Sequence, residues 1–208
     1  MSMSDNTASE ELLSHLDDPM AQGTALPFIS DRPRDCLRYK DKLIGLVRHP
    51  ETLNKQYSLE LLGSLAHCAN NNSDFLVDLF LSDNAETVQL ALRVIEFIEV
   101  LPSTLLDPIS KLIRNTDESI AAYACTAAAK GGVDSNHIGA VRLIPALIAA
   151  LDRSEHVALS AAWALGHYGL RSKAAISKLT DFANRTDDPE IKHQIELAIS
   201  VINDDENV

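Results

Sequence analysis

The feature that most constrains this chain is an apolar helical pattern that recurs about every 34 residues. The clearest copy spans residues 143–169, where two apolar segments flank a polar turn. Within each segment apolar residues recur at spacings of three and four, the period of one helix face. A repeat of this length predicts stacked helix pairs, because each pair needs its neighbours to bury its apolar face.

Five positions mark the start of the second helix in successive copies. They are Leu53, Thr87, Ile120, Val157 and Ile191. Four residues later come Tyr57, Ala91, Ala124, Ala161 and Ile195, and eight residues later come Leu61, Ile95, Ala128, Leu165 and Ile199. Side chains at these offsets share one helix face, which we expect to be buried. The longest interval contains Gly131 and Gly132, which indicate a loop insertion.

Polar residues with capping chemistry separate the two helices of each copy. The five junctions are 49–51, 83–84, 116–118, 152–155 and 187–190. Asp, Ser and Thr accept hydrogen bonds from the first amides of a helix, and Pro suits its first turn. We therefore predict five helix pairs and no strands, an all-α fold.

The negative charge of the chain is concentrated at its ends. The formal net charge is -12, residues 1–35 hold seven acidic residues against two arginines, and residues 204–208 add three acidic residues. We divide the chain into an acidic, polar leader (1–33), expected to be poorly ordered or loosely docked, a repeat domain (34–203) and an acidic tail (204–208). The sequence lacks a basic stripe, which argues against nucleic acid as a partner.

Targeting and metal-binding signals are missing from the sequence. No apolar run approaches the roughly 18 to 20 residues of a membrane helix, and the N-terminus lacks the order of a secretion signal, so we expect a cytoplasmic protein without a membrane partner. Cys36, Cys68 and Cys125 are widely spaced and are expected to be reduced and mostly buried. The histidines form no ligand-spaced pair, so we predict no metal and no other cofactor.

Residues 143–169 resemble the HEAT-repeat family, in particular the short bacterial type first associated with phycobilisome lyases. The resemblance is carried by Pro145 in the first helix, Asp152 after it, and the second-helix pattern Val157, Ala161, Ala162, Leu165 and Gly166. Residues 105–131 and 173–202 follow the pattern less closely, and 36–99 match mainly in period. The resemblance implies a right-handed α-solenoid of about five HEAT-like helix pairs, an armadillo-like superhelix.

The chain departs from this family at one position in each repeat. Many members place an arginine directly after the first buried residue of the second helix, where it bonds an aspartate ladder. Here that position holds Asn54, Val88, Ala121, Ala158 and Lys192. We therefore expect the repeats to cohere mostly by apolar packing rather than by a polar ladder.

The side of the second helices opposite the buried stripe is unusually apolar for a solvated face. This side is expected to bind a partner, since Trp, Tyr and Arg are enriched in binding hot spots. The candidate partner-binding residues are Leu90, Arg93, Phe97, Tyr123, Thr126, Leu159, Trp163, His167, His193 and Leu197. Two alternatives remain: Trp163 packs under the next repeat, or Phe97 or Leu90 belongs to the core because the register of the second repeat differs by one residue.

The preferred function is a non-catalytic protein-interaction scaffold or adaptor that binds a protein or peptide on this face. A specific version is an immunity or regulatory protein for a basic partner, attracted by the acidic ends. We predict no catalytic residues, because no nucleophile, phosphate-loop or metal motif is present. The alternative is a HEAT-like enzyme, such as a bilin lyase or, less favoured, a DNA glycosylase-like protein. Homo-oligomerisation stays open.

Overall fold

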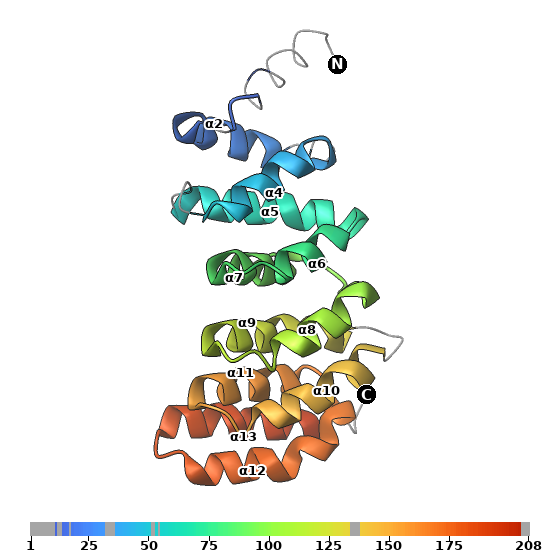
Figure 1. The fold of residues 1–208 in the computed structure, drawn as a ribbon. Helices are drawn as coiled ribbons and strands as arrows, with labels where there is room; N and C mark the ends of the chain where they lie inside the picture. Colours follow the sequence, from blue (N-terminus) through green and yellow to red (C-terminus); the bar gives the residue numbers. More distant parts are fainter. Residues whose placement is uncertain are drawn as a thin grey trace. The chain divides into compact units, whose positions relative to one another are not determined.

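The computed structural model describes residues 11, 14–16, 18–31, 36–50, 53, 55–133 and 138–204, and every element in these ranges is an α-helix or a 3₁₀-helix (Figure 1). The chain divides into two compact units, Met1–Ile98 and Glu99–Val208. The described helices include five successive pairs, α4/α5, α6/α7, α8/α9, α10/α11 and α12/α13. The predicted all-α solenoid fold of five helix pairs is confirmed.

The first unit contains two of these pairs and one preceding helix. Its elements are α2 (Pro19–Ser30), η1 (Leu37–Tyr39), α4 (Lys40–Arg48), α5 (Lys55–Asn71), α6 (Asp74–Phe80), α7 (Ala85–Val94) and η3 (Ile95–Phe97). Helix α5 packs against α2, α4 and α7, and α6 packs against α7. Helix α5 is therefore at the centre of this unit.

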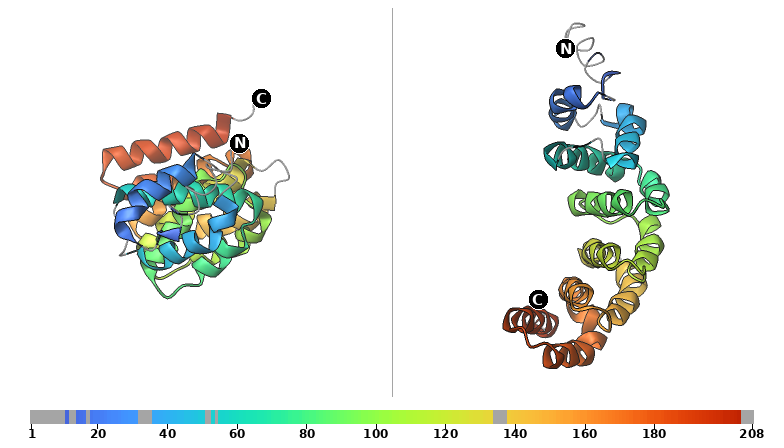
Figure 2. Two further views of the ribbon diagram at one scale, coloured as in Figure 1. Left: turned by 90° about the horizontal axis from the view of Figure 1, so that it is seen from above. Right: turned by 60° about the vertical axis from the view of Figure 1, so that its left-hand side comes forward.

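The second unit contains three helix pairs in two layers. Its elements are η4 (Ser103–Leu105), α8 (Leu106–Leu112), α9 (Glu118–Ala128), η5 (Ala129–Val133), α10 (Ile138–Ala150), α11 (Glu155–Gly166), η6 (Gly169–Ala175), α12 (Ile176–Arg185) and α13 (Pro189–Asp204). The second helices α9, α11 and α13 pack side by side, and α8 packs against α10 (Figure 2). This arrangement places α11 between α9 and α13.

The predicted buried stripe forms the core of the central repeats. Val157, Ala161 and Leu165 on α11 are fully buried. Thr87 is also fully buried although it is polar, because its hydroxyl donates to the Val47 carbonyl at 3.2 Å. All three cysteines are buried and free, as predicted.

The capping residues act largely as the sequence predicts. Asn84 accepts from the Thr87 amide at 3.0 Å, and Asp117 accepts from the Ser119 amide at 2.9 Å and the Ile120 amide at 3.0 Å. These bonds satisfy backbone donors that the first turn of a helix leaves without intrahelical partners. The cap residues thus fix where α7 and α9 begin.

Part of the acidic leader is a helix with buried side chains. Helix α2 lies within residues 1–33, packs against α5, and buries Leu26 and Ile29 completely. The two helices approach closely at Gly23, where an added Cβ would lie 2.1 Å from the Tyr57 hydroxyl. The apolar side chains of α2 and the missing Cβ of Gly23 allow this packing on α5. Residues 1–10 and 205–208 lie outside the described ranges, and the boundaries at 33/34 and 203/204 stay predictions.

Hydrogen bonds from two arginine side chains connect neighbouring repeats in the second unit. Arg153 donates to the Ile113 carbonyl at 2.8 Å and to Glu118 at 2.9 Å, and Arg185 donates to the Leu151 carbonyl at 3.1 Å. Both arginines satisfy carbonyls at the ends of first helices. The prediction that the repeats cohere mostly by apolar packing did not identify these bonds, because one donor lies in the turn before α11 and the other at the end of α12, not at the position after the first buried residue.

No helix in the described part of the chain is both long and apolar enough to cross a membrane.

Candidate binding groove

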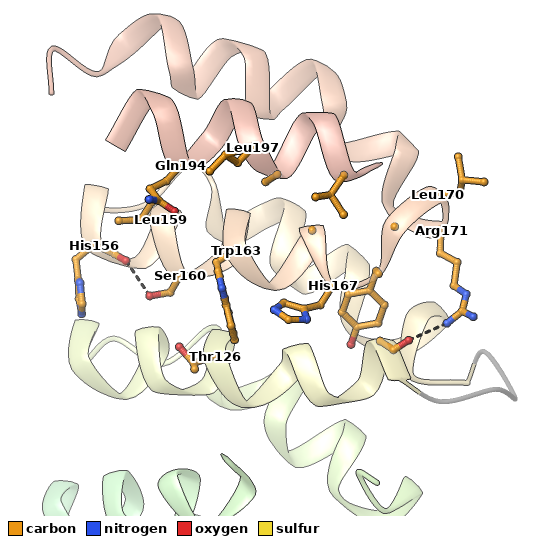
Figure 3. A pocket seen from close by; sticks show the side chains of 16 residues that line it. Thr126, His156, Leu159, Ser160, Trp163, His167, Leu170, Arg171, Gln194 and Leu197 are labelled. Atoms are coloured by element: carbon orange, nitrogen blue, oxygen red, sulfur yellow. Dashed lines mark hydrogen bonds between the residues drawn. The ribbon is translucent and has the colours of Figure 1, made fainter. Parts of the chain in front are cut away.

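A largely apolar groove crosses α9, α11 and α13 in the second unit. Figure 3 shows His156, Ser160, Trp163 and His167 in a row along α11, with Gln194 and Leu197 of α13 on one side and Thr126 of α9 on the other. The groove has a volume of about 1130 Å³. Its residues, called the α11 groove below, are Thr126, Gly132, His156, Leu159, Ser160, Trp163, Gly166, His167, Tyr168, Gly169, Leu170, Arg171, Gln194, Leu197, Ala198 and Val201.

Helical spacing on α11 and α13 explains why large apolar side chains face this groove. Trp163 and Leu197 occupy equivalent positions, six residues after Val157 and Ile191, and each is 47% exposed. The floor between the helices is made of small residues, since an added Cβ at Gly166 would lie 3.6 Å from Ala198. The small floor and large flanking side chains together form the groove.

Trp163 and His167 form an aromatic pair one helical turn apart. Their ring centroids are 4.3 Å apart with an interplanar angle of 64°, an edge-to-face arrangement. Burial lowers the pKa of His167 below its usual value, and the nearby charge of Lys130 lowers it further. Neutral His167 therefore extends the apolar surface of Trp163 at neutral pH.

A sharp turn after α11 builds one end of the groove. Gly169 has a φ of 53°, a left-handed conformation that glycine adopts without steric cost. The Tyr168 hydroxyl donates to the Ala128 carbonyl at 2.6 Å, and Arg171 donates to the Gly132 carbonyl at 3.1 Å. These two hydrogen bonds connect the turn to the end of α9 and to η5. Leu170 and Arg171 in this turn line the groove (Figure 3).

Five of the ten predicted partner-binding residues lie together in this groove: Thr126, Leu159, Trp163, His167 and Leu197. Trp163 is exposed, so the alternative that it packs under the next repeat is wrong. Tyr123 and His193 are exposed in the same unit but do not line the groove.

The other three predicted residues belong to the first unit. Arg93 is partly exposed and Phe97 is 46% exposed. Leu90 is 9% exposed, so its placement on an exposed face is wrong. Leu90 stands three residues after Thr87, at the margin of the buried stripe, and α7 packs against α4, α5 and α6.

Several groove residues were missed by the sequence prediction. Val201 stands ten residues after Ile191, equivalent to His167 in the previous repeat, and its position could have identified it. Ser160 and Gln194 are on the predicted face but are polar, so the search for apolar residues passed over them. No helical periodicity signals Leu170 and Arg171, because both lie in the turn after α11.

Three polar side chains of the groove donate hydrogen bonds within their own helices. Ser160 donates to the His156 carbonyl at 3.1 Å, Thr126 donates to the Ala122 carbonyl at 3.2 Å, and Gln194 donates to Glu190 at 3.1 Å. Among the residues that the structure describes, no three His, Cys, Asp or Glu side chains gather as a metal site.

A family model of HEAT repeats matches residues 106–200, which include α9, α11 and all but the last turn of α13. The resemblance of this segment to HEAT repeats is thereby confirmed. The match does not distinguish the short phycobilisome-lyase type, which stays a prediction. No curated protein matches the sequence.

Solved structures share the fold of the HEAT repeats and the preceding helices. A designed armadillo repeat protein in complex with the peptide (KR)4 has a TM-score of 0.59 and 18% identity, over 93% of this chain and 98% of that one. Computationally designed armadillo repeat proteins for modular peptide recognition give a TM-score of 0.59 and 17% identity, over 93% and 99%. An engineered protein has a TM-score of 0.61 and 19% sequence identity, over 94% of this chain and 98% of that one. At these identities the likeness concerns the fold.

Proposed function

We propose that this chain is a non-catalytic interaction module that binds a peptide segment of a partner protein in the α11 groove. The observation that carries the proposal is the half-exposed pair Trp163 and Leu197, which lie on neighbouring helices of one groove. Large apolar side chains that remain exposed on a folded unit favour a binding surface. Helix-in-groove and extended-peptide recognition both use such surfaces.

The structural neighbours support the same proposal. Two of them are designed armadillo repeat proteins, one in complex with the peptide (KR)4 and the other designed for modular peptide recognition. A shared scaffold does not transfer a ligand, since fold and function separate readily. It does indicate that a face built from stacked second helices can bind a peptide.

The predictions of a particular role and of a cellular location rest on the sequence alone. An immunity or regulatory role towards a basic partner rests on the net charge of -12, which would speed the approach of a positively charged protein. A cytoplasmic location also stays a prediction. No particular observation favours a bilin lyase or a DNA glycosylase-like enzyme.

The proposal is tested by selecting a random peptide library on the immobilised chain and measuring the affinity of the enriched peptides. Trp163→Ala should weaken them roughly 30-fold, the effect of losing a hot spot of about 2 kcal/mol. The matched control is Val141→Ala, because Val141 is 75% exposed on α10 and does not line the α11 groove.

Two results would contradict the proposal. One is a set of peptides that bind wild type and Trp163→Ala equally well. The other is the absence of any enriched peptide although the immobilised chain remains folded by circular dichroism.

A further inference from the structure

Two of the three cysteines meet in the first unit, although they are distant in the sequence. Cys36 directly precedes η1, and its thiol donates a hydrogen bond to the Ser64 carbonyl on α5. Cys68 stands one helical turn after Ser64 on the same helix. Both cysteine side chains are therefore at one turn of α5.

The direction of helical side chains places the Cys68 thiol beside Cys36. In an α-helix the Cα–Cβ bond tilts toward the N-terminus, so a side chain covers the turn before its own Cα. For Cys68 that turn carries the Ser64 carbonyl, which the Cys36 thiol contacts. The two sulfur atoms consequently lie within reach of each other.

The contact between the two thiols makes them chemically unequal. A hydrogen bond from the Cys68 thiol lowers the pKa of Cys36, against the opposing effect of burial. The same contact, together with burial, raises the pKa of Cys68. Cys36 is thus the sulfur that ionises first, and the thiolate is the nucleophilic form of cysteine.

The Cys36 sulfur is covered by a short element at the surface. Cys36 itself is buried, while the next residue, Leu37, is 43% exposed. A small displacement of η1 therefore exposes the sulfur to a small oxidant, since local openings of this kind need far less free energy than global unfolding.

The third cysteine provides an internal comparison. Cys125 lies on α9 in the second unit, and burial raises its pKa to about 12. The other two cysteines of the sequence belong to the first unit. Cys125 is thus a buried thiol without a second cysteine in its unit.

We propose that Cys36 and Cys68 are a modification site, where a peroxide oxidises the two thiols to a reversible disulfide that holds α4 and α5 together. The disulfide closes a loop over residues 36–68, which include all of α4 and most of α5. Helix α5 packs against α2, α4 and α7, so the cross-link restrains the centre of the first unit. A cross-link stabilises a fold mainly by reducing the freedom of the unfolded chain.

The reaction balances with one molecule of hydrogen peroxide. The Cys36 thiolate attacks one peroxide oxygen, the O–O bond breaks to leave a sulfenic acid, and the departing hydroxide takes up the proton that Cys36 released. The Cys68 sulfur then attacks the Cys36 sulfur, the S–S bond forms, and the S–O bond breaks as water leaves with the Cys68 proton. The two sulfurs lose two electrons, which the peroxide gains.

The site is tested by treating the full-length chain with hydrogen peroxide, blocking the remaining thiols with N-ethylmaleimide in denaturant, and mapping unreduced peptides by mass spectrometry. We expect one joined pair of peptides that contains Cys36 and Cys68 and has lost two hydrogen atoms, with Cys125 carrying the maleimide. Dithiothreitol should separate the pair again.

Variants of the chain locate the bond. Cys36→Ala and Cys68→Ala should each abolish the joined pair, and either one keeps the test valid if the other fails to fold. Cys125→Ala is the matched control, because it removes a buried thiol of the second unit and should leave the pair unchanged.

Hydrogen exchange measures the consequence of the bond. Amides of α4 and α5 that exchange when the first helix pair opens should exchange about 30-fold more slowly in the oxidised chain than in the reduced chain. Peroxide-treated Cys68→Ala is the control, since its methionines are oxidised in the same way without a cross-link.

Two outcomes would overturn the inference. One is a folded chain in which peroxide yields no joined pair of Cys36 and Cys68, or joins Cys125 as often as either of them. The other is a joined pair that leaves the exchange of α4 and α5 unchanged or faster, which would mean that the bond does not fit the folded unit.

Discussion

Small differences in side-chain environment decide which residues of the second helices can contact a partner. Trp163 and Leu90 were both placed on one exposed face by their helical positions, yet Trp163 is half-exposed and Leu90 is buried. Leu90 stands three residues after Thr87, whereas Trp163 stands six residues after Val157, so Leu90 lies closer to the buried stripe around its helix. Exposure therefore depends on how far around the helix a residue lies from that stripe.

His167 allows a direct test of this environment. Its pKa is lowered by burial and by Lys130, so its ring should titrate below the ordinary value of about 6.5 in an NMR titration. Lys130→Gln should raise this pKa, because it removes a like charge.

The same shift predicts a pH dependence. Because the folded-state pKa is depressed, the stability linked to His167 is present above the ordinary pKa and is lost as pH falls through it towards the folded value. Lys130→Gln should reduce this acid sensitivity, and Lys192→Gln should leave it unchanged. An unshifted His167 pKa in the wild-type chain would contradict the described burial.

At the scale of single elements, caps and turns set the helix boundaries on which the repeats depend. The Asp117 carboxylate accepts from two amides at the start of α9, and Arg153 in a turn and Arg185 at the end of α12 donate to carbonyls of the neighbouring repeat. A periodic sequence pattern locates these turns, while the identity of each bond partner requires the tertiary structure.

Asp117→Ala should lower the free energy of unfolding by about 1 kcal/mol, the usual cost of losing an N-cap. The change is measured by urea denaturation followed by circular dichroism. Asp117→Asn is the matched control, because Asn caps nearly as well as Asp. Equal losses in both variants would mean that the Asp117 charge, rather than its capping bonds, stabilises α9.

At the scale of the whole molecule, stability is expected to arise from contacts between neighbouring repeats. Helical repeats bury their core through nearest neighbours, and about three of them suffice for a continuous core. The second compact unit, Glu99–Val208, contains three helix pairs. Its contacts thus meet the requirement for independent folding.

A fragment of residues 99–208 should fold alone. We expect a helical circular dichroism spectrum, a cooperative urea transition and the Trp163 emission of the full-length chain, since Trp163 is the single tryptophan. Introducing Leu165→Ala into the fragment should cost about 2–5 kcal/mol, because Leu165 is fully buried. A fragment without a cooperative transition would show that residues 1–98 are needed for folding.

The sequence by itself determined the helix pairs, the buried stripe and five residues of the groove, because helical periodicity reports directly which face of a helix is apolar. The tertiary structure decided the rest. It buried Leu90 and packed α2 on α5, and it brought Leu170 and Arg171 to the groove through a turn that requires the positive φ of Gly169. These features depend on how close separate helices approach one another, which a pattern within one helix does not specify.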